Sequence, residues 1–479
     1  MIVPMFQDVP AAGNCSDPAI ILTSVNAGFS HANLGLRWLR ANLAELQPAC
    51  CILEGTRRLG VDRLVEAIAE LAPRIIGISV SIWNHSESRQ LMVRLRQSLP
   101  DSWIVVGGPE ASYLPAHHAL FDYADVLIRG EAELEFARLC RQLLSTSPAE
   151  SARGFRPGGA ALHEIQATVP ELSELTLPYS QLHDSDLAHR LVYIETSRGC
   201  PFRCEFCLSS VQGAVRTFPL EPVLAEIRSL YARGGRFFKV IDRTFNLDFE
   251  RAYRTLSVFL ELLSSGRNPD AYVQFEVVPD RLPIKLREIL QQFPPDTLRL
   301  EVGIQTFNNQ AAARINRKQD QQKSLENLQF LSSCTNATLH ADLIIGLPGE
   351  NLHSFAAGFD RLWAMQPGEI QLGILKALPG TTLRRHDQQW GMVWNPEPPY
   401  EIMATAAIPR AEMDELKIAA KYWELIVNRG RFPDQVHRLL PPQDGTFLRF
   451  LELSRWLYGR LGKTWGIDAA ELGRLMAEY

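Results

Sequence analysis

The sequence lacks any long apolar run, and it carries few cysteines and little net charge. No apolar stretch approaches the roughly 20 residues that a membrane-spanning helix needs. The first residues also lack the basic-then-apolar pattern of a secretory signal. These absences predict a cytoplasmic protein without a membrane partner. The net charge of −5 argues against a mainly electrostatic grip on nucleic acid.

Cysteine usage excludes a disulfide scaffold, because the chain has only 8 cysteines among 479 residues. Five of them have no ligand spacing, and we expect these to be reduced, mostly buried thiols: Cys15, Cys50, Cys51, Cys140 and Cys334. A chain of this length has room for about two to four domains, each with its own core.

The other three cysteines form a CxxxCxxC array, Cys200, Cys204 and Cys207, on a loop directly after a short β-type run. Three thiolates at this spacing can hold three irons of a four-iron, four-sulfur cluster and leave one iron without a protein ligand. An open iron is a reaction site, by the logic that separates catalytic metal sites from closed structural ones. A zinc site, a cluster with a remote fourth cysteine and a chance spacing remain open as alternatives.

Residues 1–145 alternate short apolar runs with amphipathic helical stretches. Strands are predicted at Ile20–Ser24, Ala49–Glu54, Ile75–Ile82, Trp103–Gly107 and Asp125–Ile128. Helices are predicted at Asn33–Leu46, Val61–Leu71, Ser86–Leu99 and Glu131–Leu143. This alternation indicates an α/β fold, a doubly wound, Rossmann-like parallel sheet. In such sheets ligands bind beyond the carboxyl ends of the strands.

Residues 146–185 mix Pro, Gly and Ser without a sustained period, which predicts a linker. Residues 186–377 then predict six strands: Leu191–Thr196, Phe237–Ile241, Tyr272–Val277, Leu298–Gly303, Thr338–Ile345 and Ile370–Lys376. With helical crossovers between them, these strands make a partial (β/α)6 barrel of the TIM type, and chemistry belongs at their C-terminal ends. Residues 378–479 predict a mainly helical domain, with helices at Ala411–Val427, Thr446–Leu461 and Ala469–Glu478.

The cysteine array, with the aromatic Phe206 before its last cysteine, resembles the signature of the radical S-adenosylmethionine (SAM) superfamily. The resemblance implies a [4Fe-4S] cluster on the three cysteines, SAM at the open iron and the Phe206 backbone near the adenine. SAM needs acceptors for its ribose hydroxyls and amino group and a cation near its carboxylate. Polar residues at the strand ends offer these groups, and Asp242 follows the second strand. Four others look similar in order and spacing to the SAM contacts of the oxygen-independent coproporphyrinogen oxidase type of barrel: Glu276, Gln305, Arg317 and Asp342.

The first 145 residues look like the cobalamin-binding domain that precedes the radical SAM barrel in one large subclass. Turn and strand-end residues carry this similarity and are the candidate cobalamin contacts: Ser79, Ser81, Trp83, Gly107, Gly108 and Glu131. The Asp-x-His-x-x-Gly motif that supplies a histidine to cobalt is missing around His31. Many members of the subclass bind cobalamin without it, which leaves the loop Ile82–His85 as the candidate for the lower face. The C-terminal domain is similar to a region of unknown function in one branch of these proteins.

The resemblance implies a cobalamin-dependent radical SAM enzyme. The leading hypothesis is a methyltransferase that methylates an unactivated carbon through a 5′-deoxyadenosyl radical and methylcobalamin. One alternative is a cobalamin-assisted rearrangement or oxidative cyclisation without methylation, and another is a sensor that binds cobalamin and a cluster without turnover. A one-electron donor such as flavodoxin or ferredoxin is the implied partner. No stretch of the sequence identifies the small-molecule or peptide substrate.

Overall fold

The computed structural model of the chain describes residues 17–145, 161–211, 213–442 and 445–479. The fold divides into two compact units. One contains Met1–Tyr193 with Glu221–Phe237, and the other contains Ile194–Leu220 with Phe238–Tyr479. Within the described ranges, no helix combines the length and the apolarity needed to cross a membrane.

The first unit is built on a parallel sheet with the strand order β2-β1-β3-β4-β5-β6. The strands are β1 (Ile20–Asn26), β2 (Cys50–Thr56), β3 (Ile75–Ser79), β4 (Trp103–Gly107), β5 (Val126–Arg129) and β6 (His163–Gln166). Every residue of β1 is buried, as expected for a central strand covered on both faces. This order confirms the predicted doubly wound sheet.

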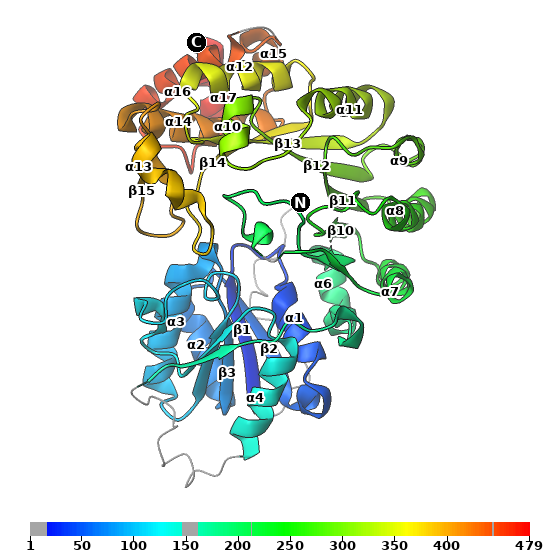
Figure 1. Ribbon diagram of the computed structural model, residues 1–479, viewed down its shortest axis with the longest axis vertical. Coiled ribbons are helices and arrows are strands. Elements are labelled where there is room, and N and C mark those ends of the chain that lie inside the picture. Colours follow the sequence, from blue (N-terminus) through cyan, green and yellow to red (C-terminus); the bar gives the residue numbers. More distant parts are fainter. Residues whose placement is uncertain (1–16, 146–160, 212, 443–444) are drawn as a thin grey trace. The chain divides into compact units, whose positions relative to one another are not determined.

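Helices cover both faces of this sheet (Figure 1). On one face pack α2 (Val61–Leu71) and α3 (His85–Ser98), and their apolar side chains join one core cluster. On the other face pack α1 (Leu34–Ala41) and α4 (Glu133–Ser145). All four helices lie within two residues of their predicted starts, because each has a clear apolar stripe of period 3.6.

One strand of this sheet lies where the sequence predicts a linker. Residues 163–166 form β6, which pairs in parallel with β5 at the sheet edge. The linker prediction is therefore wrong for this segment. Its four side chains, His-Glu-Ile-Gln, include none that is buried, so the strand carries no apolar signature. Backbone hydrogen bonds to β5 hold it instead, and these leave no trace in the sequence pattern.

The second sheet has the order β14-β13-β12-β11-β10-β7. Its strands are β7 (Leu191–Ile194), β10 (Phe237–Val240), β11 (Tyr272–Val277), β12 (Leu298–Gln305), β13 (Thr338–Ile345) and β14 (Glu369–Ile374). The helices of the crossovers are α7 (Leu220–Ala232), α8 (Phe249–Ser264), α9 (Ile284–Leu290), α10 (Asn309–Arg314), α11 (Gln321–Cys334) and α12 (Leu352–Trp363). Six strands in chain order with helical crossovers confirm the predicted partial barrel.

Side chains of β12 and β13 alternate strictly between two environments. Along β12 and β13 every second residue is buried and every other one is partly exposed. The buried set is apolar and packs under the helices, whereas the partly exposed set carries charges such as Glu301 and Asp342. The period of two therefore places a row of polar groups on the inner face of the half-barrel.

The C-terminal region consists mainly of helices, as predicted: α14 (Arg410–Trp423), α15 (Pro433–Leu439), α16 (Thr446–Leu461) and α17 (Ala469–Glu478). The buried Trp423 indole contacts Phe359 and Trp363 of α12 edge-on, with ring centroids 4.7 and 5.2 Å away. It also meets Phe450 of α16 at 5.0 Å. These contacts dock the C-terminal helices onto the last barrel helix through one aromatic cluster.

The cysteines outside the array differ partly from expectation. Cys50 and Cys140 are free and buried, and Cys334 is free but exposed. Cys51 is disulfide-bonded, so the prediction of a reduced thiol is wrong there. Cys15 lies outside the described residues. Disulfide pairing depends on which segments the fold brings together, and spacing along the chain does not encode that.

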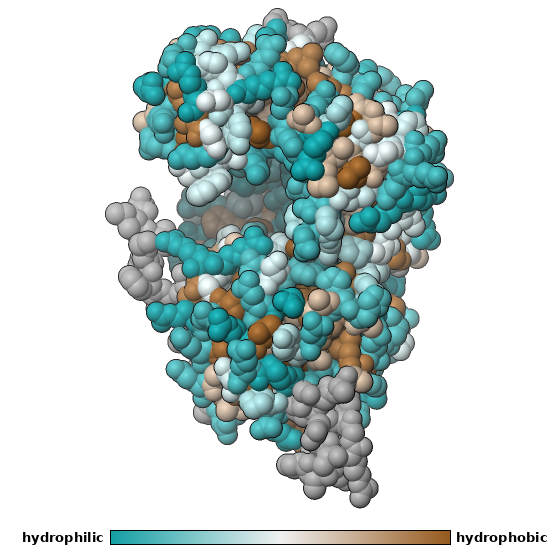
Figure 2. All heavy atoms as spheres, turned by 90° about the vertical axis from the view of Figure 1, so that its left-hand side faces the viewer, coloured by the Kyte–Doolittle hydropathy of each residue, from teal (hydrophilic) through white to brown (hydrophobic). Residues whose placement is uncertain are grey.

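On the face drawn in Figure 2, hydrophobic residues form small separate patches among hydrophilic ones. Large exposed apolar side chains of the described residues come from scattered positions, with Trp465 and Ile284 the most exposed. Scattered apolar residues of this kind are ordinary on protein surfaces.

Candidate active site

The three cysteines lie on a loop whose backbone is fixed before the first of them. After β7, the short strand β8 (Ser197–Arg198) pairs with β9 (Arg216–Thr217), and Gly199 follows with a φ of +94°. A Cβ atom on Gly199 would lie 2.6 Å from the Ala214 carbonyl oxygen, so only glycine fits there. The Cys200 amide then donates to the Gly213 carbonyl at 3.2 Å.

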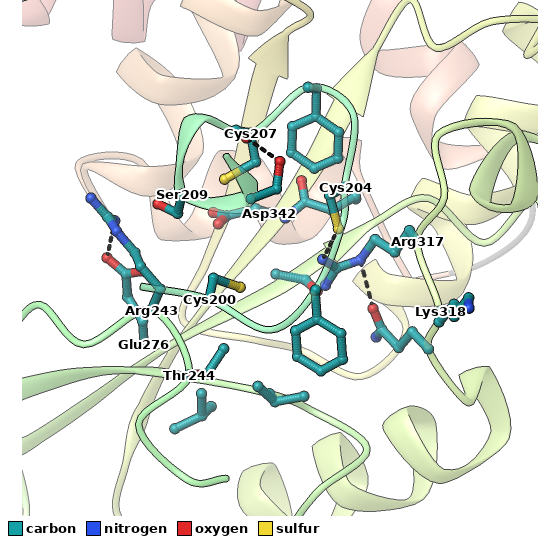
Figure 3. Close-up of a pocket in the computed structure, with 18 of the residues that line it drawn as sticks. Cys200, Cys204, Cys207, Ser209, Arg243, Thr244, Glu276, Arg317, Lys318 and Asp342 are labelled. Carbon is teal, nitrogen blue, oxygen red and sulfur yellow. Dashed lines mark hydrogen bonds and ion pairs between the residues drawn. The ribbon is translucent and has the colours of Figure 1, made fainter. Parts of the chain in front are cut away.

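The cysteines line one pocket together with residues from the C-terminal ends of the barrel strands (Figure 3). The pocket holds about 880 Å³ of empty space, counting its opening to solvent. The lining residues used below are Cys200, Cys204, Phe206, Cys207, Arg243, Glu276, Glu301, Gln305, Arg317 and Asp342.

Most of the predicted SAM contacts come together here. Phe206 from the cluster loop, Glu276 from β11, Gln305 from β12 and Asp342 from β13 line the pocket, and so does Arg317. These residues are spread over more than a hundred positions of the sequence. The parallel strands end at one edge of the sheet, and this brings the side chains together.

Asp242 lies outside this pocket, so a direct SAM contact by this residue is not supported. Its buried carboxylate accepts hydrogen bonds from the Thr196 amide at 2.7 Å and the Thr196 hydroxyl at 2.5 Å. The Ser197 hydroxyl donates a third at 2.7 Å. These three donors all belong to the segment between β7 and the cluster loop. Asp242 therefore fixes the backbone that leads into the cluster loop.

Arg317 is anchored on three sides. Its Nε donates to the Gln319 side-chain oxygen at 2.8 Å, and one Nη donates to the Gly303 carbonyl. The other Nη faces the Cys204 sulfur at 3.7 Å, as the dashed line in Figure 3 marks. The guanidinium charge is therefore directed at a cluster ligand as well as at the pocket.

On the other side of the pocket, Arg243 forms a two-oxygen contact with Glu276 at 2.9 and 3.2 Å (Figure 3). Glu301 lies beside Glu276 in the paired register of β11 and β12. Its carboxylate accepts from Lys239 at 2.7 Å and from Gln274 at 2.9 Å. Cations thus hold two of the three carboxylates of the pocket.

The third carboxylate, Asp342, is held differently. Its Oδ1 is buried, and it has no hydrogen-bond partner among the described residues. Burial, reinforced by the charges of Glu301 and Glu276, raises the pKa of Asp342 to about 7. A buried carboxyl oxygen that is not satisfied by the protein is suited to accept from a bound ligand.

Gln305 is placed by an irregularity in β12. The pairing of β12 with β13 shifts register between Gly303 and Gln305, and Gln305 has a φ of +70°. Directly after it, the Thr306 hydroxyl donates to the buried Glu350 carboxylate at 2.5 Å. This contact holds the strained corner that turns Gln305 into the pocket.

The donor set fits a cluster with one open iron. The described residues that line the pocket include three cysteines and no fourth. Burial raises the pKa of the Cys200 and Cys204 thiols, and the Arg317 charge opposes this at Cys204. Among described residues, no three His, Cys, Asp or Glu side chains converge on a single-ion site. Each thiolate of a cluster binds its own iron, so convergence on one point is not required.

Arg243 and Glu301 stood among the polar strand-end residues of the sequence but were not assigned as SAM contacts, and Lys239, which donates to Glu301, was not singled out. For Glu301 the sequence does contain a signal, because this residue stands at an inward-facing position of a strand whose side chains alternate with period two. The pairing of these charges depends on the register between strands. One sequence alone does not give that register.

The predicted cobalamin contacts of the first unit lie along the C-terminal edge of its sheet. Ser79 and Gly107 are register partners at the ends of β3 and β4. A Cβ on Gly108, whose φ is +106°, would lie 2.6 Å from the Val80 carbonyl oxygen. Ser81 begins the short helix η2 (Ile82–Asn84) and is buried. The turn at Gly107 and Gly108 thus lets its backbone lie close to the backbone of Val80, which a side chain at Gly108 would prevent.

The candidate lower-face loop Ile82–His85 divides into bound and exposed side chains. The Asn84 amide donates to the Ser24 hydroxyl and to the Val25 and Ser79 carbonyls. His85 is buried and contacts Glu110 at 3.2 Å. Trp83, by contrast, is 49% exposed. Of this loop, Trp83 offers the largest surface to a ligand.

Glu131 completes the predicted set, and His31 marks the place where the cobalt-ligand motif is missing. His31 Nδ1 lies 2.6 Å from the Tyr193 hydroxyl, so its ring is engaged within the unit. Glu131 follows Gly130, which has a φ of +89° at the end of β5. It therefore stands at the same carboxyl edge as the other candidates.

Comparison with known proteins assigns domains to these parts. Residues 21–140 match the B12 binding domain, and residues 194–362 match the Radical SAM superfamily. Residues 388–466 match a protein family of unknown function, DUF4080. The order of the three matches along the chain agrees with the resemblance found in the sequence.

Two relatives are methyltransferases by name. The cobalamin-dependent radical SAM methyltransferase TokK of Streptomyces tokunonensis is 24% identical over 68% of this chain and 50% of its own length. The 2-(S-pantetheinyl)-carbapenam-3-carboxylate methyltransferase of Streptantibioticus cattleyicolor is 24% identical over 62% of this chain and 47% of its own length. The match thus spans about half of each relative.

Solved structures share the fold. The radical SAM methyltransferase TsrM of Kitasatospora setae, with cobalamin and a [4Fe-4S] cluster bound, has a TM-score of 0.62 at 18% identity. The match covers 79% of this chain and 81% of TsrM. The cobalamin-dependent radical enzyme OxsB, with aqua-cobalamin bound, has a TM-score of 0.61 at 14% identity, covering 96% of this chain and 75% of OxsB.

Proposed function

We propose that this chain, which belongs to the cobalamin-binding radical SAM proteins, is a methyltransferase that methylates an unactivated carbon. The domains and the named activities of the relatives support the proposal. The observation that carries it is the pocket in which three cysteines meet the strand-end polar groups, in a chain that also has a B12-binding domain.

When bound, the cluster and SAM supply radical chemistry and cobalamin carries the methyl group. The chain holds and orients these groups. Cys200, Cys204 and Cys207 hold the cluster, and Arg317 and Asp342 offer a cation and an acceptor to SAM. The remaining proposed SAM contacts are Phe206, Glu276 and Gln305.

In the first unit, residues of the carboxyl edge would hold cobalamin. Ser79, Ser81, Gly107, Gly108 and Glu131 are the proposed contacts beside the corrin, because they end or follow parallel strands. Trp83 is the proposed lower-face residue, because it is the exposed side chain of its loop. A tryptophan offers no lone pair to cobalt, and it would cover the face by packing.

Radical SAM enzymes need a reductant, and for this chain we propose a flavodoxin or a ferredoxin. The proposed substrate is a small molecule or a peptide. A cytoplasmic location stays a prediction from the sequence.

The test uses anaerobically reconstituted protein with SAM whose methyl group carries ¹⁴C. With titanium citrate as reductant and without any substrate, we expect label on the protein-bound cobalamin, because methyl transfer to cobalt precedes substrate methylation. Cobalamin that stays unlabelled would overturn the methyltransferase proposal. The Trp83→Ala variant, changed at an exposed position, serves as a cobalamin-site probe whose fold is expected to be unaffected.

The alternatives are separated by products. A rearrangement or cyclisation would leave the substrate without a gain of one CH2 group. A sensor would give no 5′-deoxyadenosine from SAM and dithionite. Production of 5′-deoxyadenosine together with labelled cobalamin supports the methyltransferase.

A further inference from the structure

The cluster loop carries a buried acidic side chain that none of the roles above uses. Glu205 stands directly after Cys204 and two residues before Cys207, and it is 5% exposed. An ionised carboxylate in such a position destabilises the fold unless it is paired and hydrogen-bonded. Its partners therefore show what the loop is fastened to.

Both carboxylate oxygens of Glu205 are bound by η7 (Leu383–His386), which begins the C-terminal region beyond the barrel. His386 Nε2 lies 2.9 Å from one oxygen, and His386 is itself 7% exposed. Arg385 binds the other oxygen. The donor and acceptor are 181 residues apart in the chain, so this contact exists only in the folded state.

The opposite side of the cluster loop is fastened by backbone contacts. The Glu205 amide donates to the Ile315 carbonyl at 3.1 Å. The Asn316 side chain donates to the Arg203 carbonyl at 3.1 Å. The loop is thus held between the segment after α10 and η7, and among the described residues the Glu205 carboxylate makes the polar contacts with η7.

The η7 segment is itself fixed. Leu383 is fully buried, and the Trp394 indole donates to Asp387 at 2.7 Å just beyond η7. In Figure 1 this part of the chain continues into α13 (Asp387–Trp390) and β15 (Val393–Trp394). The anchor that reaches Glu205 is therefore a rigid one.

We propose that Arg385 and His386 are positioning residues for the iron–sulfur cluster, and that they act through Glu205. Their contacts fix the backbone that presents Cys204 and Cys207, and they balance a negative charge beside the cluster. This assigns a role to the start of the C-terminal region, whose following residues match a family of unknown function. The inference needs the cluster but not methyl transfer, so the two proposals fail separately.

The charges predict two opposite shifts of the cluster's reduction potential. Reduction adds one electron to the cluster, so a nearby carboxylate opposes it and a nearby cation favours it. Glu205→Gln is expected to raise the potential, and Arg385→Gln to lower it. The Arg385 side chain is 60% exposed, so solvent screening makes its shift the smaller one. The double variant is expected to have a potential between those of the two single variants.

Removal of the buried hydrogen bond predicts a loss of cluster retention. His386→Phe leaves a Glu205 oxygen unpaired, and changes of such outer partners commonly weaken metal sites by roughly tenfold or more. His386→Gln keeps an N–H donor near the position of Nε2, and it is expected to restore retention. Arg384→Gln is the matched control, because Arg384 lies on the same turn over the Trp394 ring and has no described contact with Glu205.

The experiment uses the full-length chain, reconstituted anaerobically with iron and sulfide. Iron and sulfide per chain are measured after gel filtration, and the potential is measured by a redox titration followed by electron paramagnetic resonance. Opposite shifts for Glu205→Gln and Arg385→Gln, with His386→Gln rescuing His386→Phe, support the inference. Potentials equal to wild type, shifts of equal sign, or equal iron loss in both His386 variants overturn it. If His386→Phe fails to fold, the reduction potential of Arg385→Gln, a variant at an exposed side chain, still tests the inference.

Discussion

Arg317 places a guanidinium nitrogen 3.7 Å from the sulfur of Cys204. The same guanidinium is tied to Gln319 and to the Gly303 carbonyl, so its orientation is fixed before any ligand binds. Hydrogen bonds and positive charge at a cluster sulfur favour the reduced cluster. Arg317 therefore belongs to the cluster's surroundings as well as to the proposed SAM site.

From this contact we expect Arg317→Gln to make the reduction potential of the cluster more negative. The reason is the loss of one positive charge beside Cys204. A redox titration of the reconstituted protein measures the change. Lys318→Gln, at the neighbouring position of the same pocket, is the control and should change the potential less. A potential for Arg317→Gln equal to that of the control would contradict the assignment.

Replacing the three array cysteines together by alanine should remove the cluster and leave cobalamin. The cysteines belong to the second unit and the proposed cobalamin contacts to the first. Ultraviolet-visible spectra with iron, sulfide and cobalt analysis measure both cofactors. Cys334→Ala, which removes an exposed thiol, is the control and should keep both. Iron content unchanged in the triple variant would show that the cluster site lies elsewhere.

Asp342→Asn should stabilise the cofactor-free protein, and increasingly so as the pH rises from about 4 to 7. The pKa of Asp342 is raised from 3.8 to about 7 by burial and by Glu301 and Glu276. Between these values the unfolded chain has lost the proton that the folded chain keeps, so wild-type stability falls with pH. The loss approaches a limit on the order of 4 kcal/mol above pH 7.

Thermal unfolding of wild type and Asp342→Asn at pH 5 and pH 8 tests this. The variant should gain more over wild type at pH 8. A gain that is the same at both values would mean that the carboxylate is satisfied in solution.

Gly108→Ala should destabilise the first unit and weaken cobalamin binding. The added Cβ would meet the Val80 carbonyl oxygen at 2.6 Å, in a backbone conformation with a φ of +106°. Strain of this kind costs about 1–3 kcal/mol. Gly28→Ala is the matched control, because its Cβ would have no atom within 4 Å. Chemical denaturation and cobalt content measure the two effects, and equal values for both variants would contradict the prediction.

Much of the fold was predictable because its signals are local. The strand runs at Trp103–Gly107, Tyr272–Val277 and Thr338–Ile345 match β4, β11 and β13 residue for residue. Their apolar periods and flanking turns lie within a few residues of one another. Strand β6 was missed for the converse reason, since an exposed polar edge strand has no period to find.

The candidate site divides in the same way. Glu276, Gln305, Arg317 and Asp342 were predicted from their similarity, in order and spacing, to the SAM contacts of a known type of barrel, and they do line one pocket. Asp242 was predicted with them, yet its carboxylate binds Thr196 and Ser197 instead. Strand ends show which residues reach one edge of the sheet. They do not show which of them turn inward.

The sequence by itself determined the cluster loop, because three cysteines within eight residues need no distant partner to form their array. It also determined that one α/β sheet follows another along the chain, since most strands and helices carry their own apolar period, with β6 as an exception. Only the tertiary structure decided which charges pair. Two of these relationships join different segments of the chain: the contact of Glu205 with His386 and the register that sets Glu276 beside Glu301. The burial of the unpaired Asp342 oxygen likewise depends on the segments packed around it. Such contacts arise from packing and strand register, which depend on the whole fold.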